Sequence, residues 1–169
     1  MPAKKPTRAR VTAKSPKITT FLMFNRGTEE AVKRYVALFQ DGKILSLDEM
    51  GRGPDGTRLV NAAFEIGGQR FLAMDGGPHF SFAEGMSLFI NCATQAEVDH
   101  FWEGLSKGGK KGRCGWLTDP WGVSWQVVPS ALGEMLSDPE SGNSAAVMEA
   151  MLKMDKLDIR TLERAYAKK

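Results

Sequence analysis

Hydrophobic and polar positions change their period along the chain, and these changes outline its secondary structure. Short runs alternate apolar and polar side chains and are rich in β-branched and aromatic residues, which is the pattern of half-buried strands. Two longer segments repeat apolar residues every three or four positions, which predicts amphipathic helices. The first helix opens at Thr28 and ends before Gly42. The second opens at the capping box Thr94–Glu97 and ends at Gly108.

The predicted strands fall into two groups around these helices. The first group comprises residues 18–24, 43–50, 58–66 and 69–74. The second group comprises residues 86–92, 113–117 and 123–128. Gly67–Gly68 is a two-residue turn between the last two strands of the first group. Because the order of strands and helix repeats, the sequence predicts an α+β fold of two βαββ(β) modules.

Both ends of the chain differ from this body. Residues 1–17 hold six Lys or Arg, three Pro and no acidic residue, which predicts a disordered basic tail. A solvated extension is the favoured interpretation, with weak RNA or DNA contact as the alternative. Residues 18–137 carry the two modules, and residues 138–169 extend the same domain with helices near Ala145 and after Asp158. The methionine-rich stripe of this extension predicts core packing, or alternatively a dimer contact.

Composition narrows the class of protein. The chain has 23 Lys or Arg and 20 Asp or Glu; without the six in the tail, 17 basic residues face 20 acidic ones, a net charge of −3. The body is therefore not expected to bind nucleic acid. No apolar run is long enough to cross a membrane, and no secretion signal follows the basic start. Cys92 and Cys114 have no CxxC spacing, so we expect reduced thiols in a cytoplasmic protein.

The most distinctive segment is CGWLTDPWGVSWQVVP at 114–129, which places three tryptophans around one Asp-Pro-Trp-Gly turn. Further motifs are ITTFLMF at 18–24, GGPHFSF at 76–82 and EVDHFWEGLSKGG at 97–109. Together these motifs resemble the PhnB-like branch, or 3-demethylubiquinone-9 3-methyltransferase domain, of the vicinal-oxygen-chelate superfamily. That superfamily includes glyoxalase I, bleomycin-resistance proteins and extradiol dioxygenases. The resemblance implies a glyoxalase-like cupped mixed sheet around a pocket, and a homodimer.

The resemblance also raises the question of a metal. Metal-using members of the superfamily hold a divalent ion with His, Gln or Glu from the first and last strands of each module. The corresponding strands here offer Thr19, Thr20, Asp75, Ser87, Asn91 and Gln126. This set is poor for a dication, so we predict no metal. The glycine pairs at 67–68 and 76–77 precede no helix, so no S-adenosylmethionine site is expected either, and no cofactor is predicted.

Candidate functional residues follow from the same comparison. The candidates for catalysis are His79, Asp75 and Glu84, with a turn-stabilising role as the alternative for Asp75. His100 lies outside the apolar stripe of its helix and is expected to be solvated. The predicted ligand-binding residues are the aromatic and amide side chains of the strands: Trp116, Trp125, Phe89, Phe21, Phe64, Gln126 and Asn91.

Three functions fit these observations. The first is a metal-free protein that binds a small aromatic or hydrophobic molecule, and the second is a metal-dependent lyase, isomerase or dioxygenase. The third is a dimeric scaffold. Missing metal ligands favour the first or third, and an open pocket with aromatic walls favours the first over the third. The sequence therefore favours a small-molecule-binding protein and leaves open whether it is an enzyme.

Overall fold

The computed structural model describes residues 16–138 and 143–167. Its first module contains β1 (Thr20–Phe24), α1 (Thr28–Leu38), β2 (Lys43–Arg52), β3 (Arg58–Ile66) and β4 (Gln69–Asp75). The strands form a mixed sheet in the order β1-β4-β3-β2, in which β1 runs parallel to β4 and the other neighbours are antiparallel. β1 is thus one edge of this sheet.

The second module repeats this plan. It contains β5 (Leu88–Cys92), α2 (Gln95–Ser106), β6 (Lys110–Lys111), β7 (Trp116–Thr118) and β8 (Ser124–Pro129). The sheet order is β5-β8-β7-β6, and β5 runs parallel to β8. The predicted α+β fold of two modules is therefore confirmed. Two details of this module differ from the prediction. Lys110 and Lys111, for which no strand was predicted, form β6 because they pair with Thr118 and Leu117 of β7, and the strand predicted at 113–117 spans Trp116–Thr118.

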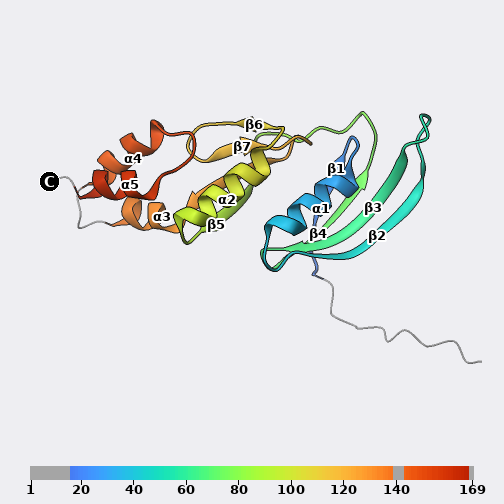
Figure 1. The fold of residues 1–169 in the computed structure, drawn as a ribbon, viewed down its shortest axis with the longest axis horizontal. Coiled ribbons are helices and arrows are strands. Elements are labelled where there is room, and N and C mark those ends of the chain that lie inside the picture. Colours follow the sequence, from blue (N-terminus) through green and yellow to red (C-terminus); the bar gives the residue numbers. More distant parts are fainter. Residues whose placement is uncertain (1–15, 139–142, 168–169) are drawn as a thin grey trace, which may run out of the picture.

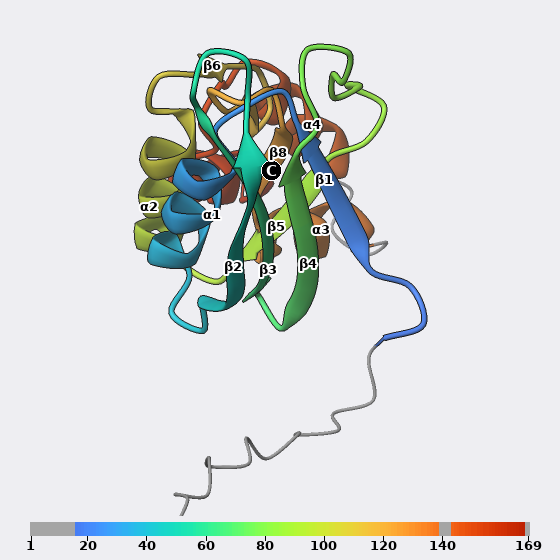
Figure 2. The same ribbon diagram turned by 90° about the vertical axis from the view of Figure 1, so that its right-hand side faces the viewer.

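Helices α1 and α2 lie between the two sheets and join them through one core. The ring of Tyr35 on α1 lies 6.2 Å from Phe64 of β3 and 5.1 Å from Trp125 of β8, measured between centroids. The modules lie side by side along the long axis (Figure 1). Figure 2 looks towards the first sheet, with the second module behind it. Because the helices occupy the inner faces, each sheet has an opposite, helix-free face in this two-module core.

The C-terminal helices form a smaller hydrophobic cluster of their own. They are α3 (Ser130–Ser137), α4 (Ser144–Leu152) and α5 (Ile159–Tyr166). The cluster contains Leu132, Met135, Val147, Leu157 and Leu162, and it packs against Val128 of β8. α3 was not predicted, since its apolar pattern covers barely two turns. Part of the predicted methionine stripe packs on this cluster, whereas Met148 and Leu152 are exposed.

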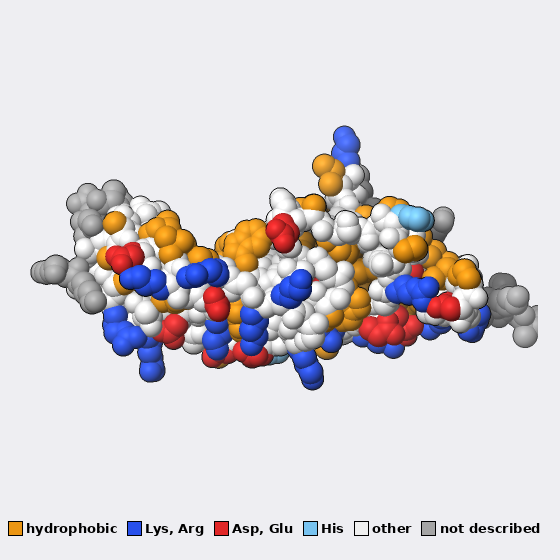
Figure 3. All heavy atoms as spheres, turned by 90° about the horizontal axis from the view of Figure 1, so that it is seen from above, with side chains coloured by type: hydrophobic (Ala, Val, Ile, Leu, Met, Phe, Trp, Pro, Cys, Tyr) orange, Lys and Arg blue, Asp and Glu red, His pale blue; other side chains and the backbone are white. Residues whose placement is uncertain are grey.

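The described surface carries charges of both signs. On the face seen in Figure 3, Lys and Arg side chains are interspersed with Asp and Glu along one long edge. This view shows no continuous basic surface. Among the described residues, none of the helices is long and apolar enough to cross a membrane. The predicted basic tail lies outside the described residues except for Pro16 and Lys17.

Candidate functional site

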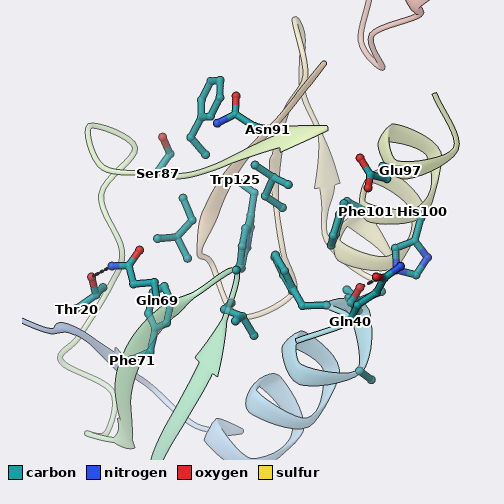
Figure 4. A pocket seen from close by; sticks show the side chains of 18 of the residues that line it. Thr20, Gln40, Gln69, Phe71, Ser87, Asn91, Glu97, His100, Phe101 and Trp125 are labelled. Atoms are coloured by element: carbon teal, nitrogen blue, oxygen red, sulfur yellow. Dashed lines mark hydrogen bonds between the residues drawn. The ribbon is translucent and has the colours of Figure 1, made fainter. Parts of the chain in front are cut away.

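A cleft of about 950 Å³ opens at the junction of the two modules. The edge strands β1 and β5, the end of α1 and the start of α2 surround it (Figure 4). Its volume lies in the range of pockets that bind small molecules. The cleft is therefore a product of how the modules pack, because each contributes about half of the lining.

The lining of the cleft is mixed, with apolar and polar surface in nearly equal shares. Trp125 of β8 lies at its centre in Figure 4, between Phe71 of β4 on one side and Phe101 of α2 on the other. The remaining apolar lining comes from Leu38, Phe39, Ile66, Met86, Leu88, Phe89 and Ile90. Trp125 and Phe71 are almost fully buried, whereas Phe89 and Phe101 are more open and offer ring surface to a flat or hydrophobic ligand.

Polar side chains sit towards the two ends of the cleft. At one end, Gln69 donates a hydrogen bond from Nε2 to Oγ1 of Thr20 over 3.0 Å. At the other end, Nε2 of His100 lies 2.8 Å from the carbonyl oxygen of Leu38, near the close of α1, with Gln40 beside them (Figure 4). His100 is exposed, as predicted. The prediction missed its bond to the first module, which links the two helices across the cleft.

One buried carboxylate holds the tryptophan at the cleft floor. Asp119, in the turn between β7 and β8, accepts hydrogen bonds at Oδ2 from the Tyr35 hydroxyl (2.5 Å) and Trp125 Nε1 (2.9 Å). Its Oδ1 accepts from the backbone N–H groups of Trp121 and Val123, both at 3.0 Å. Burial raises the pKa of Asp119, although these four donors act in the opposite direction. Burial and the neighbouring Asp119 also raise the pKa of Tyr35 well above its ordinary value.

The predicted ligand-binding residues separate onto different faces of the sheets. Trp116, Phe89 and Gln126 lie side by side on the helix-free face of the second sheet, because the strand register aligns them. Asn91 follows two residues after Phe89 on the same strand, and Phe21 lies on the helix-free face of the first sheet. Trp125 and Phe64 face the helices and are fully buried. Of these predicted residues, Phe89, Asn91 and Trp125 line the cleft.

The three candidates for catalysis do not form a cluster. Both oxygens of Asp75 are occupied: Oδ1 accepts from the N–H and hydroxyl of Thr28, and Oδ2 accepts from the N–H of Val60. Asp75 therefore stabilises the start of α1. His79 and Glu84 are exposed in the linker between the modules. Among the described residues, no hydrogen bond or ion pair joins either of them to Asp75.

The comparison with family models assigns the chain to a protein family. The family model described as 3-demethylubiquinone-9 3-methyltransferase matches residues 16–128, which cover both modules. The chain belongs to this family. The resemblance inferred from the motifs is thereby confirmed. No curated protein matches the chain.

One solved structure supports this assignment to the 3-demethylubiquinone-9 3-methyltransferase family, and a second shares the fold. The PhnB protein from Bacillus cereus shares 34% identity over 68% of this chain and 100% of its own, with a TM-score of 0.62. A protein from Pseudomonas aeruginosa has the same fold, with 24% identity over 68% of this chain and 98% of its own and a TM-score of 0.59. A glyoxalase/bleomycin-resistance protein from Albidiferax ferrireducens T118 is 16% identical over 64% of this chain and 93% of its own, with a TM-score of 0.41.

The donor groups of this family member do not fit the metal centre that the resemblance to the vicinal-oxygen-chelate superfamily implies. Within the described ranges, no three or more His, Cys, Asp or Glu side chains are placed to hold a metal ion. Gln126 donates its Nε2 to Ser87 Oγ over 2.8 Å, which leaves its Oε1 as a single neutral oxygen donor. Asp75 is saturated by backbone and hydroxyl donors. We therefore derive no chemical step through a metal.

The Cys92 thiol and the two glycine pairs of this PhnB-like chain bear on whether it has a nucleophile or a nucleotide-binding turn. Burial raises the pKa of the Cys92 thiol to about 12, so this thiol stays protonated and is a poor nucleophile. The glycine pairs lie where the sequence predicted: Gly67–Gly68 joins β3 to β4, and Gly76–Gly77 begins the linker after β4. Neither precedes a helix, which is the position that a phosphate-binding or nucleotide-binding turn takes.

The cleft lining from the helices was not predicted. Gln40, Glu97, His100 and Phe101 come from the end of the α1 segment and the first turns of α2. No sequence signal places them together, since the His100–Leu38 contact joins residues 62 positions apart. Only the packing of one module on the other brings them to a common space.

Proposed function

We propose that this chain binds a small aromatic or hydrophobic molecule in the cleft between its modules, and does so without a metal ion. The observation that carries the proposal is the cleft of about 950 Å³, with Trp125 on its floor and further aromatic walls. The fixing of Trp125 by Asp119 supports it, because a preorganised wall loses little entropy when a ligand binds. The donor set described above supports binding without a metal.

A neutral fluorescent dye, Nile red, tests the cleft as a binding site. Ala96 is an exposed, small residue at the start of α2 that lines the cleft, so Ala96→Trp fills the space without altering the core. The matched control is Ala145→Trp, an exposed alanine on α4 that does not line the cleft. We expect Nile red to bind the native protein and the control equally, and Ala96→Trp to bind about tenfold more weakly or worse.

The same titration tests whether ligand binding needs a metal ion. The protein is grown with Mn, Fe, Ni and Zn, its metal content is measured by elemental mass spectrometry, and Nile red binding is repeated after treatment with EDTA. Unchanged binding with metal well below one ion per chain supports the proposal. Near-stoichiometric metal that is needed for binding would replace it with a metal-dependent lyase, isomerase or dioxygenase. Equal binding by Ala96→Trp would remove the cleft as the site.

We also propose that the working form is a homodimer. Three large aromatic side chains on the helix-free faces are open to solvent: Phe21 is 46% exposed, Phe89 52% and Trp116 37%. Exposed rings grouped on a sheet face favour contact with another protein surface. A second copy offers the same faces, and a two-fold pairing covers both sets at once.

A further inference from the structure

The lining of the cleft is poor in charge. None of the described residues that line it is a Lys, an Arg or an Asp, and the ionisable side chains are Glu97 and His100. Glu97 is exposed, and its Oε2 accepts a hydrogen bond over 2.6 Å from the backbone N–H of Ala93, the residue before the N-cap of α2. His100 is bonded to the carbonyl oxygen of Leu38. Both side chains therefore form hydrogen bonds with backbone groups at the rim of the cleft.

The amide and hydroxyl groups of the cleft lie in three places: one group at each end, and between them Asn91 of β5 and Ser87 just before that strand. Figure 4 shows Thr20 and Gln69 at one end, Gln40 and His100 at the other, and Trp125 between them. Because Oγ1 of Thr20 accepts from Gln69, the Thr20 hydroxyl keeps its hydrogen to donate, and Oε1 of Gln69 remains an acceptor. The Leu38 carbonyl can only accept, so Nε2 of His100 is the donor in their hydrogen bond.

We infer that the cleft selects uncharged ligands: a flat or elongated apolar body with a hydroxyl, carbonyl or amide group at each end. This inference rests on the proposed function and names the ligand class. An ion in the cleft would lose part of its hydration. An anion meets no Lys or Arg among the described lining residues, and the acidic group that a cation would meet, Glu97, already accepts from the N–H of Ala93. A neutral molecule loses little hydration over its rings and regains its hydrogen bonds at the two ends.

Three compounds of one shape and different charge test the selection. They are 2-naphthamide, which is neutral, 2-naphthoate, which is an anion, and 2-naphthylmethylamine, which is a cation at neutral pH. Each is titrated against Nile red bound to the full chain, and the displacement constant is measured. We expect the amide to displace the dye at a concentration at least about tenfold lower than either ion requires.

The two-ended character is tested with 6-hydroxy-2-naphthamide, which adds a second polar group at the far end of the same ring system. We expect it to displace Nile red at a severalfold lower concentration than 2-naphthamide. Gln69→Leu and His100→Phe should each abolish this gain, because each removes the hydrogen-bonding group of one end. Asn61→Leu is the matched control, since Asn61 is an exposed amide of β3 outside the cleft.

The outcomes separate this inference from the proposed function. If an ion displaces the dye as well as the amide does, or if no compound displaces it, neutral selection is wrong while Nile red binding keeps the cleft as a binding site. If the second polar group brings no gain, or the gain survives in both variants, the two-ended ligand is wrong. If Nile red does not bind in the cleft, the proposed function fails, and the inference fails with it.

Discussion

At the scale of single residues, Asp119 makes hydrogen bonds that the sequence reveals only in part. Its place in an Asp-Pro-Trp-Gly turn predicts bonds to the backbone of that turn, and those to Trp121 and Val123 are present. Its second oxygen, however, accepts from Tyr35, which lies 84 positions earlier in the other module. The same carboxylate thus fixes the turn, the cleft floor and the junction between modules.

Removing the partners of Asp119 tests this triple role. We expect Tyr35→Phe to lower the free energy of unfolding by about 1–2 kcal/mol, and Asp119→Ala by roughly 3 kcal/mol or more, because four donors then lose their acceptor. Urea denaturation followed by circular dichroism measures both. In the double variant the Tyr35 change should cost much less than it does alone. Strictly additive losses would show that the Tyr35 bond contributes independently of Asp119.

At the scale of elements, local sequence signals placed most starts and turns correctly. The capping box at α2 is present, with the Thr94 hydroxyl accepting from the N–H of Glu97 over 3.2 Å. Asp158 caps α5 in the same way, accepting from the N–H of Thr161 over 2.7 Å. Before β7 the backbone is more constrained: Gly115 has φ +83°, and a Cβ there would lie 2.6 Å from the carbonyl oxygen of Val127.

This constraint gives a paired prediction for two glycines. We expect Gly115→Ala to lower the free energy of unfolding by about 1–3 kcal/mol, because a side chain there clashes with β8 and the backbone is left-handed. Gly133→Ala is the control: it lies within α3 with open space around its Cβ position, so it should stabilise by up to about 1 kcal/mol. Thermal and urea denaturation measure both. A neutral Gly115→Ala would contradict the close approach of the chain to Val127.

At the scale of the whole molecule, the arrangement of the modules decides what is buried and what is open. Both helices lie between the sheets, so the inner faces merge into one core and Phe64 and Trp125 are buried there. The outer faces keep Phe21, Phe89 and Trp116 exposed. The cleft opens at the junction of the modules, with Thr20 of β1 and residues of β4 on the side of the first module and β5 on the side of the second.

The proposed homodimer follows from these open faces and has a direct test. Light scattering after gel filtration should give a mass near twice the 18.6 kDa of one chain. Trp116→Glu should shift the protein towards the monomer, because it places a charge among the exposed rings. Leu152→Glu, at an exposed position of α4, should leave the dimer intact. Dissociation by Leu152→Glu alone would move the interface to the C-terminal helices, and a native monomer would remove the dimer.

The sequence by itself determined the family, the two βαββ(β) modules and most of the turns and caps. These features depend on residues within a few positions of one another, so periodicity, capping pairs and the motif at 114–129 were sufficient. Short elements such as β6 and α3 were missed, because two residues or two turns give too weak a pattern.

Only the tertiary structure decided which face of each strand meets a helix, and therefore which aromatic residues are core. Trp125 and Trp116 both flank the same turn, yet one is buried beside Tyr35 and the other is exposed. It also decided the cleft, since Thr20 and Gln69 meet His100 and Phe101 there through the docking of two modules. Such contacts depend on the fit of whole surfaces far apart in the chain, which no local pattern of residues encodes.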